Sequence, residues 1–221
     1  MCTVSYIKTD EGVIITSNRD EKVIRQKALN PQEYIINNRV ITFPKDPQAG
    51  GTWIAHTDQS CVVLLNGAEI KHQSNPPYRE SRGKIVLELV SGNPVNDWEI
   101  INLENIEPFT LITYQNNQLF QFRWNGLCKE TIELNANDAH IWSSSTLYSQ
   151  KIKDKREAWF SDFLSKNKDI NSEKMLNFHL FTENSNTENG LQINRNNTYK
   201  TVSITQIVKN TSTKMNHIDL M

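Results

Sequence analysis

Residues 1–8, MCTVSYIK, place a β-forming run directly after the initiator methionine, and its first residue is a cysteine. The segment from Cys2 to Lys8 is rich in β-branched and aromatic residues, so it predicts a strand that starts at the cysteine. Aminopeptidase removes the initiator methionine when the next residue is small, and cysteine qualifies. We therefore expect a mature chain in which Cys2 carries both a thiol and a free α-amine.

The two groups on Cys2 suit a nucleophile and its own base. An unperturbed thiol has a pKa of about 8.5 and an α-amine one of about 7.7–8.0, so the amine can accept the proton of the thiol near neutral pH. Threonine and an N-terminal amine form the same kind of activated pair. A cysteine at this position also occurs by chance, so the rest of the chain has to support the assignment of Cys2 as a catalytic residue.

The composition excludes several classes of protein. The chain has 221 residues and a net charge of −1, so it has no electrostatic footprint for nucleic acid. No apolar run reaches transmembrane length, and no signal peptide precedes the first strand, so we expect no stable membrane insertion. The three cysteines, Cys2, Cys61 and Cys128, lack the spacing of a disulfide framework or a zinc site. These features favour a cytoplasmic protein that uses no cofactor or metal and acts on a small molecule.

The order of predicted elements favours an α+β fold. Strands are predicted at 2–8, 13–17, 40–43, 52–56, 60–66, 109–114, 119–124, 130–134 and 199–208, and helices at 81–90, 95–103, 149–165 and 173–181. Residues 22–39 and 182–197 are expected to be irregular. No composition shift divides the chain, so a single domain over residues 1–221 is predicted, with its oligomeric state left open. The asparagine-rich C-terminal part suggests a bacterial source.

Polar clusters interrupt the apolar strands at four further places. They are Asn18-Arg19-Asp20-Glu21, Gly50-Gly51-Thr52-Trp53, Asn66-Gly67 and Ser143-Ser144-Ser145-Thr146. Polar side chains at strand ends are where sites are commonly built on a sheet scaffold. The two glycines of the second cluster are better explained by architecture, since glycine permits a close backbone approach or a positive φ. Trp53 is expected to pack in the core.

The chain resembles the NRDE family, which is the family of the transport and Golgi organisation protein. The residues that carry the resemblance are Met1-Cys2, Asn18-Arg19-Asp20-Glu21, Gly50-Gly51-Thr52-Trp53 and the downstream Ser81-Arg82-Gly83. The resemblance implies an N-terminal-nucleophile (Ntn) hydrolase-like fold, which is a four-layer αββα sandwich of two antiparallel sheets between helices.

A more distant likeness, to bile salt hydrolases and penicillin V acylases, implies roles for individual residues. The matching catalytic candidates are Cys2, Arg19, Asp20 and Asn66. Ser143 and Ser144, where those enzymes have an asparagine, and Arg82 are candidates for substrate binding. The serines supply no amide, so one of two expected amide donors is missing.

Physical chemistry makes these roles plausible. A cation such as Arg19 near the Cys2 thiol would lower its pKa, and the amide of Asn66 would stabilise the oxyanion formed by attack on a carbonyl. Asp20 would orient the α-amine by accepting its hydrogen bonds. Each of these residues also has a purely structural explanation. Arg19 and Asp20 could form an ion pair, and Asn66-Gly67 could be a simple turn. The serine run could be a turn before a helix that Ser149 caps.

Two functions from different classes follow. The first is a cysteine Ntn hydrolase of non-peptide C–N amide bonds. The second is a binding or trafficking protein for haem, lipid or acyl-CoA that keeps the fold without the reaction, with the Cys2 thiolate as an axial haem ligand. The missing asparagine at Ser143–Ser145 favours the second.

Overall fold

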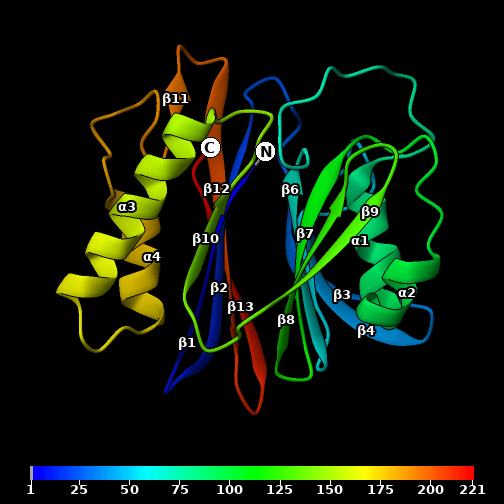
Figure 1. Ribbon diagram of the computed structural model, residues 1–221, viewed down its shortest axis with the longest axis horizontal. Coiled ribbons are helices and arrows are strands. Elements are labelled where there is room, and N and C mark those ends of the chain that lie inside the picture. Colours follow the sequence, from blue (N-terminus) through cyan, green and yellow to red (C-terminus); the bar gives the residue numbers. More distant parts are fainter. Residues whose placement is uncertain (1) are drawn as a thin grey trace. The chain divides into compact units, whose positions relative to one another are not determined.

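The computed structural model describes residues 2–221, which divide into two compact units. The first combines the residues up to Arg25 with Asn137–Met221, and the second is Gln26–Ala136. Each unit contains one antiparallel sheet and two helices (Figure 1). The expected α+β class with two antiparallel sheets is therefore confirmed.

The sheet of the first unit is built around the N-terminal hairpin. Its strands are β1 (Cys2–Thr9), β2 (Gly12–Lys22), β10 (His140–Ser143), β11 (Asn194–Arg195), β12 (Tyr199–Lys209) and β13 (Thr213–Asp219). Their order is β10-β1-β2-β12, and β11 and β13 both pair with the other edge of β12. Cys2 thus starts a strand that is paired on both sides.

Two helices, α3 (Gln150–Lys166) and α4 (Ser172–Phe181), lie on the same face of this sheet (Figure 1). Side chains of β1 and β2 that point to this face meet the helices in an apolar cluster. Its buried members are Ile7, Ile14, Phe160, Met175, Phe178 and Leu191. Because strand residues alternate between faces, Cys2 belongs to the opposite face from Ile7.

The second unit is a seven-stranded meander with strands in sequence order. They are β3 (Leu29–Ile36), β4 (Arg39–Lys45), β5 (Ile54–His56), β6 (Ser60–Asn66), β7 (Phe109–Gln115), β8 (Gln118–Trp124) and β9 (Lys129–Leu134). Helices α1 (Arg82–Ser91) and α2 (Pro94–Ile100) pack on this sheet. Trp98 of α2 anchors them, since its ring stacks on Phe122 at 4.9 Å and meets Phe109 edge-on at 6.0 Å.

The structure corrects the sequence-based elements in three places. First, β2 continues through Lys22, so the Asn18–Glu21 run lies inside a strand and its side chains alternate between two faces. Second, residues 22–39 are not irregular: β3 pairs with β4 through a turn at Asn37 and Asn38, which have φ of 51° and 59°. Third, β13 was not expected at all. Exposure explains both omissions, because β3 and β13 are edge strands with few buried side chains.

The segment 182–197 is also more ordered than expected, because it contributes the buried Leu191 and Ile193 and the short strand β11. The four sequence-predicted helices form within a few residues of their expected limits. Ser149 occupies the N-cap position of α3, although its side chain makes no capping hydrogen bond.

The glycine pair of the second unit fulfils both expected reasons for glycine. Gly50 has a φ of 72°, and a Cβ there would make only an ordinary 3.8 Å contact with Cε of Lys84, whereas a Cβ on Gly51 would lie 2.3 Å from the carbonyl carbon of Gly83. The start of α1 therefore packs directly on the backbone after Gly50, and Trp53 is buried as expected.

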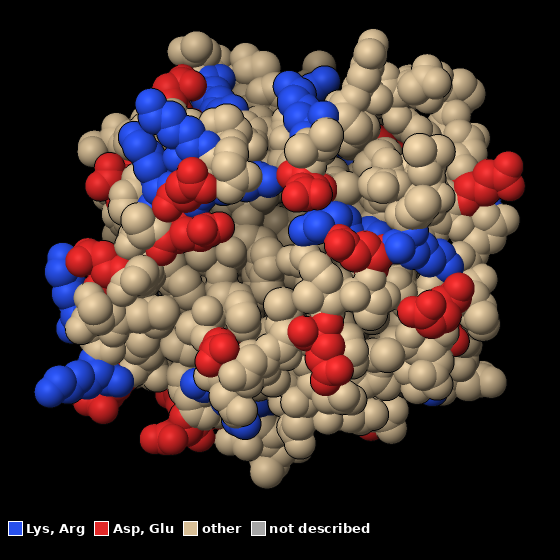
Figure 2. Space-filling model, viewed as in Figure 1, with Lys and Arg blue, Asp and Glu red and all other residues tan. Residues whose placement is uncertain are grey.

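None of the helices in residues 2–221 combines the length and the apolar character needed to cross a membrane. Acidic and basic side chains are interspersed over the face drawn in Figure 2, without a broad area of one sign.

Candidate functional site

Cys2 is the first residue of β1 and lies at one end of the first unit's sheet. Its register partner on β2 is Arg19, and its carbonyl accepts the backbone N–H of Ser144 at 3.0 Å. The side chain is 2% exposed. Since directly opposed residues of an antiparallel pair share a face, the thiol and the Arg19 side chain lie on the same side of the sheet.

Burial raises the pKa of the Cys2 thiol, and the nearby Asp20 carboxylate adds to the rise. The Arg19 guanidinium and the hydroxyl of Ser17 act in the opposite direction. Desolvation outweighs the stabilising groups, so the neutral thiol is favoured. A nucleophilic thiol in this position needs a base to remove its proton.

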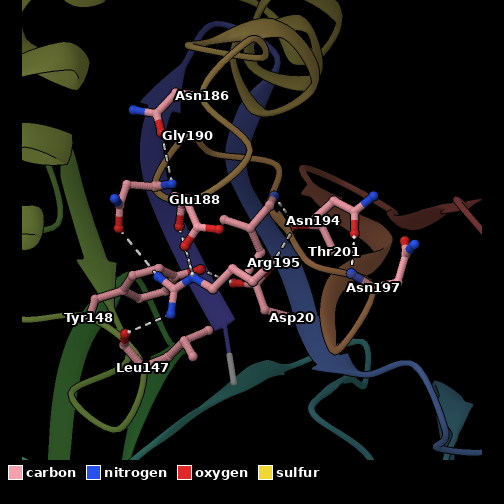
Figure 3. A network of polar contacts seen from close by, with 12 residues as sticks. Asp20, Leu147, Tyr148, Asn186, Glu188, Gly190, Asn194, Arg195, Asn197 and Thr201 are labelled. Atoms are coloured by element: carbon pink, nitrogen blue, oxygen red, sulfur yellow. Dashed lines mark hydrogen bonds and ion pairs between the residues drawn. The ribbon is translucent and has the colours of Figure 1, made fainter.

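Asp20 points to the opposite face of the sheet, which is the face covered by helices, and it is fully buried. Tyr148 donates its hydroxyl to Asp20 Oδ2 at 2.5 Å, and Thr201 donates to Oδ1 at 2.6 Å (Figure 3). Burial raises the pKa of Asp20, while Arg156 and the two hydroxyls lower it. Both carboxyl oxygens are thus fixed in place by hydrogen bonds.

Arg156 of α3 is a buried cation that the sequence did not single out. Its Nη2 donates to the carbonyl of Gly190 at 2.5 Å, and its Nη1 contacts the hydroxyl of Thr3. The guanidinium carbon lies 3.6 Å from the centroid of the Tyr148 ring. Arg156 therefore joins the start of β1, the loop before β11 and the ring that holds Asp20.

A second arginine, Arg195 of β11, lies over the same tyrosine. Its guanidinium carbon is 5.4 Å from the Tyr148 ring centroid, and Figure 3 places its side chain between Glu188 and Leu147. Arg195 Nε donates to the carbonyl of Glu188 at 2.8 Å. No sequence pattern marks this residue, because it stands in an asparagine-rich segment with the composition of a surface loop.

The side chain of Asn18 is buried on the helix-covered face of the sheet. Its Oδ1 accepts a hydrogen bond at 2.7 Å from Nδ1 of the buried His179, whose Nε2 lies 2.7 Å from the hydroxyl of Ser5. Burial, with Arg156 nearby, lowers the pKa of His179 to about 3, so the ring is neutral. With Nδ1 donating to Asn18, Nε2 accepts from Ser5. This buried Ser5–His179–Asn18 chain is structural.

The two serines proposed for substrate binding have different surroundings. Ser143 is the register partner of Thr3, and its hydroxyl is 3.4 Å from Nη1 of Arg156 on the helix-covered side. Ser144 lies just beyond the end of β10, where its backbone N–H donates to the Cys2 carbonyl and its hydroxyl is 2.9 Å from Oγ1 of Thr146. Of the two serines, Ser144 is therefore the one whose backbone bonds directly to Cys2.

The remaining candidates, Asn66 and Arg82, belong to the second unit. Asn66 ends β6 opposite Phe109, and the turn after it is held by Gly67, whose N–H donates to the carbonyl of Pro108 at 2.9 Å. Arg82 forms an ion pair with Glu107 at 2.8 Å. The first unit thus gathers Cys2, Arg19, Asp20 and both serines, while Asn66 and Arg82 are placed within the second.

No group of three His, Cys, Asp or Glu side chains within residues 2–221 is arranged to hold a metal ion. All three cysteines are free thiols, and Cys2 and Cys61 are buried while Cys128 is exposed. The Cys2 thiol shares its face of the sheet with the Arg19 guanidinium, and the fixed Asp20 carboxylate acts on its pKa from the opposite face.

Comparison with solved structures identifies the fold class. Penicillin V acylase from Agrobacterium tumefaciens superposes with a TM-score of 0.55 at 11% identity, covering 100% of this chain and 86% of that one. A variant of conjugated bile acid hydrolase from Clostridium perfringens gives a TM-score of 0.51 at 9% identity, covering 99% and 92%. A search of curated proteins finds no match.

The fold, with a cysteine at the start of its first strand, is that of the Ntn-hydrolase-like proteins, as expected. A model of the family "Transport and Golgi organisation 2" matches residues 1–218. The chain belongs to this family, which confirms the resemblance at that level.

Proposed function

We propose that this protein is a cysteine hydrolase that cleaves a non-peptide C–N amide bond of a small molecule, with Cys2 as the nucleophile once Met1 is removed. The observation that carries the proposal is the position of the thiol. It starts β1, shares a face with its register partner Arg19, and lies near Asp20, whose two oxygens are fixed by Tyr148 and Thr201.

The proposed reaction follows from the protonation state of the thiol. Because burial raises the pKa of Cys2, the thiol needs a base, and the α-amine that Met1 removal creates is the nearest one. As sulfur bonds to the carbonyl carbon, the thiol proton passes to the amine. The tetrahedral oxyanion then collapses, the C–N bond breaks, and the leaving nitrogen takes that proton. Water hydrolyses the thioester, releasing a carboxylic acid and restoring the thiol.

Each remaining candidate has an assigned part in this scheme. Arg19 stabilises thiolate character, and Asp20 orients the α-amine. The likeness to the acylases assigns Asn66 to the oxyanion and Ser144 and Arg82 to the substrate. Ser143 shares that assignment only through the likeness, because its hydroxyl lies 3.4 Å from Nη1 of Arg156 on the helix-covered side. The distant likeness to bile salt hydrolases and penicillin V acylases supports the roles of Arg19 and Asp20.

Intact mass spectrometry of the purified protein tests the premise. We expect the mass of a chain that begins at Cys2. A chain that retains Met1 has no free amine on Cys2, and that result would end the free-amine mechanism.

Activity is tested on a panel of small N-acyl amides, with Cys2→Ala and Cys2→Ser compared with wild type. We expect no turnover for Cys2→Ala and a mass increment equal to the acyl group on wild type alone. Cys128→Ser is the matched control, because Cys128 is an exposed thiol of the second unit. Equal turnover by Cys2→Ala and wild type would refute the proposal.

Asn66→Ala tests the oxyanion donor. Removal of one such donor typically lowers kcat about 10²–10³-fold, and Asn96→Ala, at an exposed position of α2, should leave it unchanged. An Asn66→Ala variant with normal kcat would exclude Asn66 from the reaction.

The alternative function is binding of haem, lipid or acyl-CoA without chemistry. It is favoured by the serine run, where Ser144 offers a hydroxyl in place of an amide. Titration with haem and with acyl-CoA, followed by absorbance and calorimetry, should then give saturable binding that Cys2→Ala abolishes for haem. Absence of saturable binding would remove this alternative.

We also propose that the protein is cytoplasmic and that residues 1–221 act as one functional domain. Three free thiols support a reducing compartment.

A further inference from the structure

A pocket of about 460 Å³ lies wholly within the second unit. It is formed by residues 68–72, which follow β6, by the β8–β9 turn at 125–130, and by Arg123 and Pro108. This volume is within the range of sites that bind small molecules. None of the residues assigned above to the reaction of Cys2 lines it.

Two large apolar side chains of this pocket are exposed. Ile70 is 77% exposed and Leu127 is 87% exposed, although both are of a kind that is normally buried. Pro108 adds a further apolar surface. Exposed apolar residues gathered at a concavity mark places where an apolar ligand binds. The pocket can therefore cover a hydrocarbon chain.

The cations of the pocket differ in what they can offer a ligand. Lys71 is exposed and makes no hydrogen bond or ion pair within residues 2–221. Arg123 is engaged, because its Nη1 pairs with Glu130 at 2.6 Å and its Nε is buried away from solvent. Lys71 is therefore the cation whose ammonium group is open to an anionic ligand.

The remaining charged side chains of the pocket leave its lining with a net positive charge. Lys129 holds the carbonyls of Trp98 and Glu99 with Nζ, at 2.7 and 2.9 Å. Glu130 is engaged with Arg123, which leaves Glu69 as the second acidic side chain of the lining. The lining thus contains three Lys or Arg residues against two acidic ones, which favours an anion.

We propose that this pocket binds a small amphipathic carboxylate. Its hydrocarbon chain would lie against Ile70, Leu127 and Pro108, and its carboxylate would accept a hydrogen bond from Lys71. The proposal concerns the second unit alone and stands whether or not Cys2 is a catalyst.

Cys128 provides the reporter, because it lines the pocket and is exposed, whereas Cys2 and Cys61 are 2% and 0% exposed. Iodoacetamide labelling of the native protein is followed by intact mass, with decanoate as the ligand and decanol and decyltrimethylammonium as chain-matched controls. The Cys2→Ala variant is used throughout, so that the proposed catalytic site cannot contribute.

Mass action predicts that decanoate at ten times its Kd slows the labelling of Cys128 about tenfold. Decanol should protect more weakly, and the cationic compound should not protect. Lys71→Gln should raise the Kd of decanoate about twofold to fivefold, the range of an exposed ion pair. Lys151→Gln, an exposed lysine of α3, should leave the Kd unchanged.

Three results would overturn the proposal. The first is no protection by decanoate up to its solubility limit, and the second is equal protection by decanol. The third is a labelling rate that falls with protein concentration in the absence of decanoate, because a second copy of the chain would then be covering the pocket.

Discussion

The hydroxyl of Tyr148 lies 2.5 Å from Oδ2 of Asp20, and 128 sequence positions separate the two residues. Burial, and then the adjacent Asp20 charge, raise the pKa of Tyr148 well above its usual value, so its hydroxyl stays protonated and donates. Asp20 lies next to Arg19 in a strand that pairs with β1. The tyrosine thus fixes the acidic member of the candidate site from outside the strands that carry it.

Removal of this hydroxyl should weaken the fold. Tyr148→Phe keeps the ring over Arg156 but takes one donor from Asp20, and a hydrogen bond to a charged group contributes about 1.5–3 kcal/mol. We expect a loss of about that size in the free energy of unfolding, measured with urea. The control is Tyr34→Phe, since the buried hydroxyl of Tyr34 has no hydrogen-bond partner among the described residues and its removal should cost little. Equal losses in the two variants would contradict the assignment.

Arg156 should not tolerate lysine. Its planar guanidinium serves Gly190, Thr3 and the Tyr148 ring at the same time, and an ammonium group cannot reproduce that geometry. Because the buried groups that Arg156 contacts would lose their partner, we expect Arg156→Lys to lower the free energy of unfolding by about 3 kcal/mol or more. Arg39→Lys, at an exposed position, should stay within about 0.5 kcal/mol. A thermal unfolding midpoint of Arg156→Lys close to that of wild type would show that the network is dispensable.

His179 should make the protein sensitive to acid. Its pKa falls from 6.5 to about 3 on folding because burial and Arg156 oppose a charged ring. The folded state then binds fewer protons than the unfolded state, so this stability is complete above pH 6.5 and is lost as the pH falls from 6.5 towards 3. The limiting loss is about 5 kcal/mol.

Urea unfolding between pH 7 and pH 4 measures this slope. We expect His179→Gln to be less stable than wild type at pH 7 but to lose less stability on acidification. Parallel pH dependences for the two proteins would show that another group is responsible.

The glycine pair separates two kinds of backbone constraint. Gly50→Ala places a side chain at a φ of 72° without a steric clash and should cost about 1 kcal/mol. Gly51→Ala forces a Cβ to within 2.3 Å of the Gly83 backbone, and overpacking of this kind should cost about 3 kcal/mol or more. Thermal unfolding midpoints of the two variants test this prediction. A Gly50→Ala variant less stable than Gly51→Ala would contradict it.

Local signals were sufficient for most of the elements. The β1–β2 hairpin follows from two apolar runs around a turn, and α3 from apolar residues at helical spacing. The edge strands β3 and β13 were missed because their side chains are largely exposed and lack the apolar alternation of a half-buried strand. The expected end of β2 at Ser17 was wrong for a related reason. Polar residues suggested a strand end, although buried partners satisfy them in the middle of a sheet.

The sequence by itself determined where the site begins. It placed Cys2 at the first position of a strand, Arg19 and Asp20 directly after the predicted end of the next strand, and glycines where the backbone passes closely. Those features depend on neighbours in the chain and on the alternation of strand faces, so they can be read from a short stretch.

Tertiary structure alone decided which groups complete the surroundings of Asp20 and which serine bonds to the backbone of Cys2. Arg156 belongs to a charged helix and has the pattern of an exposed residue, yet packing of α3 buries it against Thr3 and Gly190. Partners this distant in sequence meet only when the helices cover the sheet, because contacts between separate elements follow from packing rather than from local propensity.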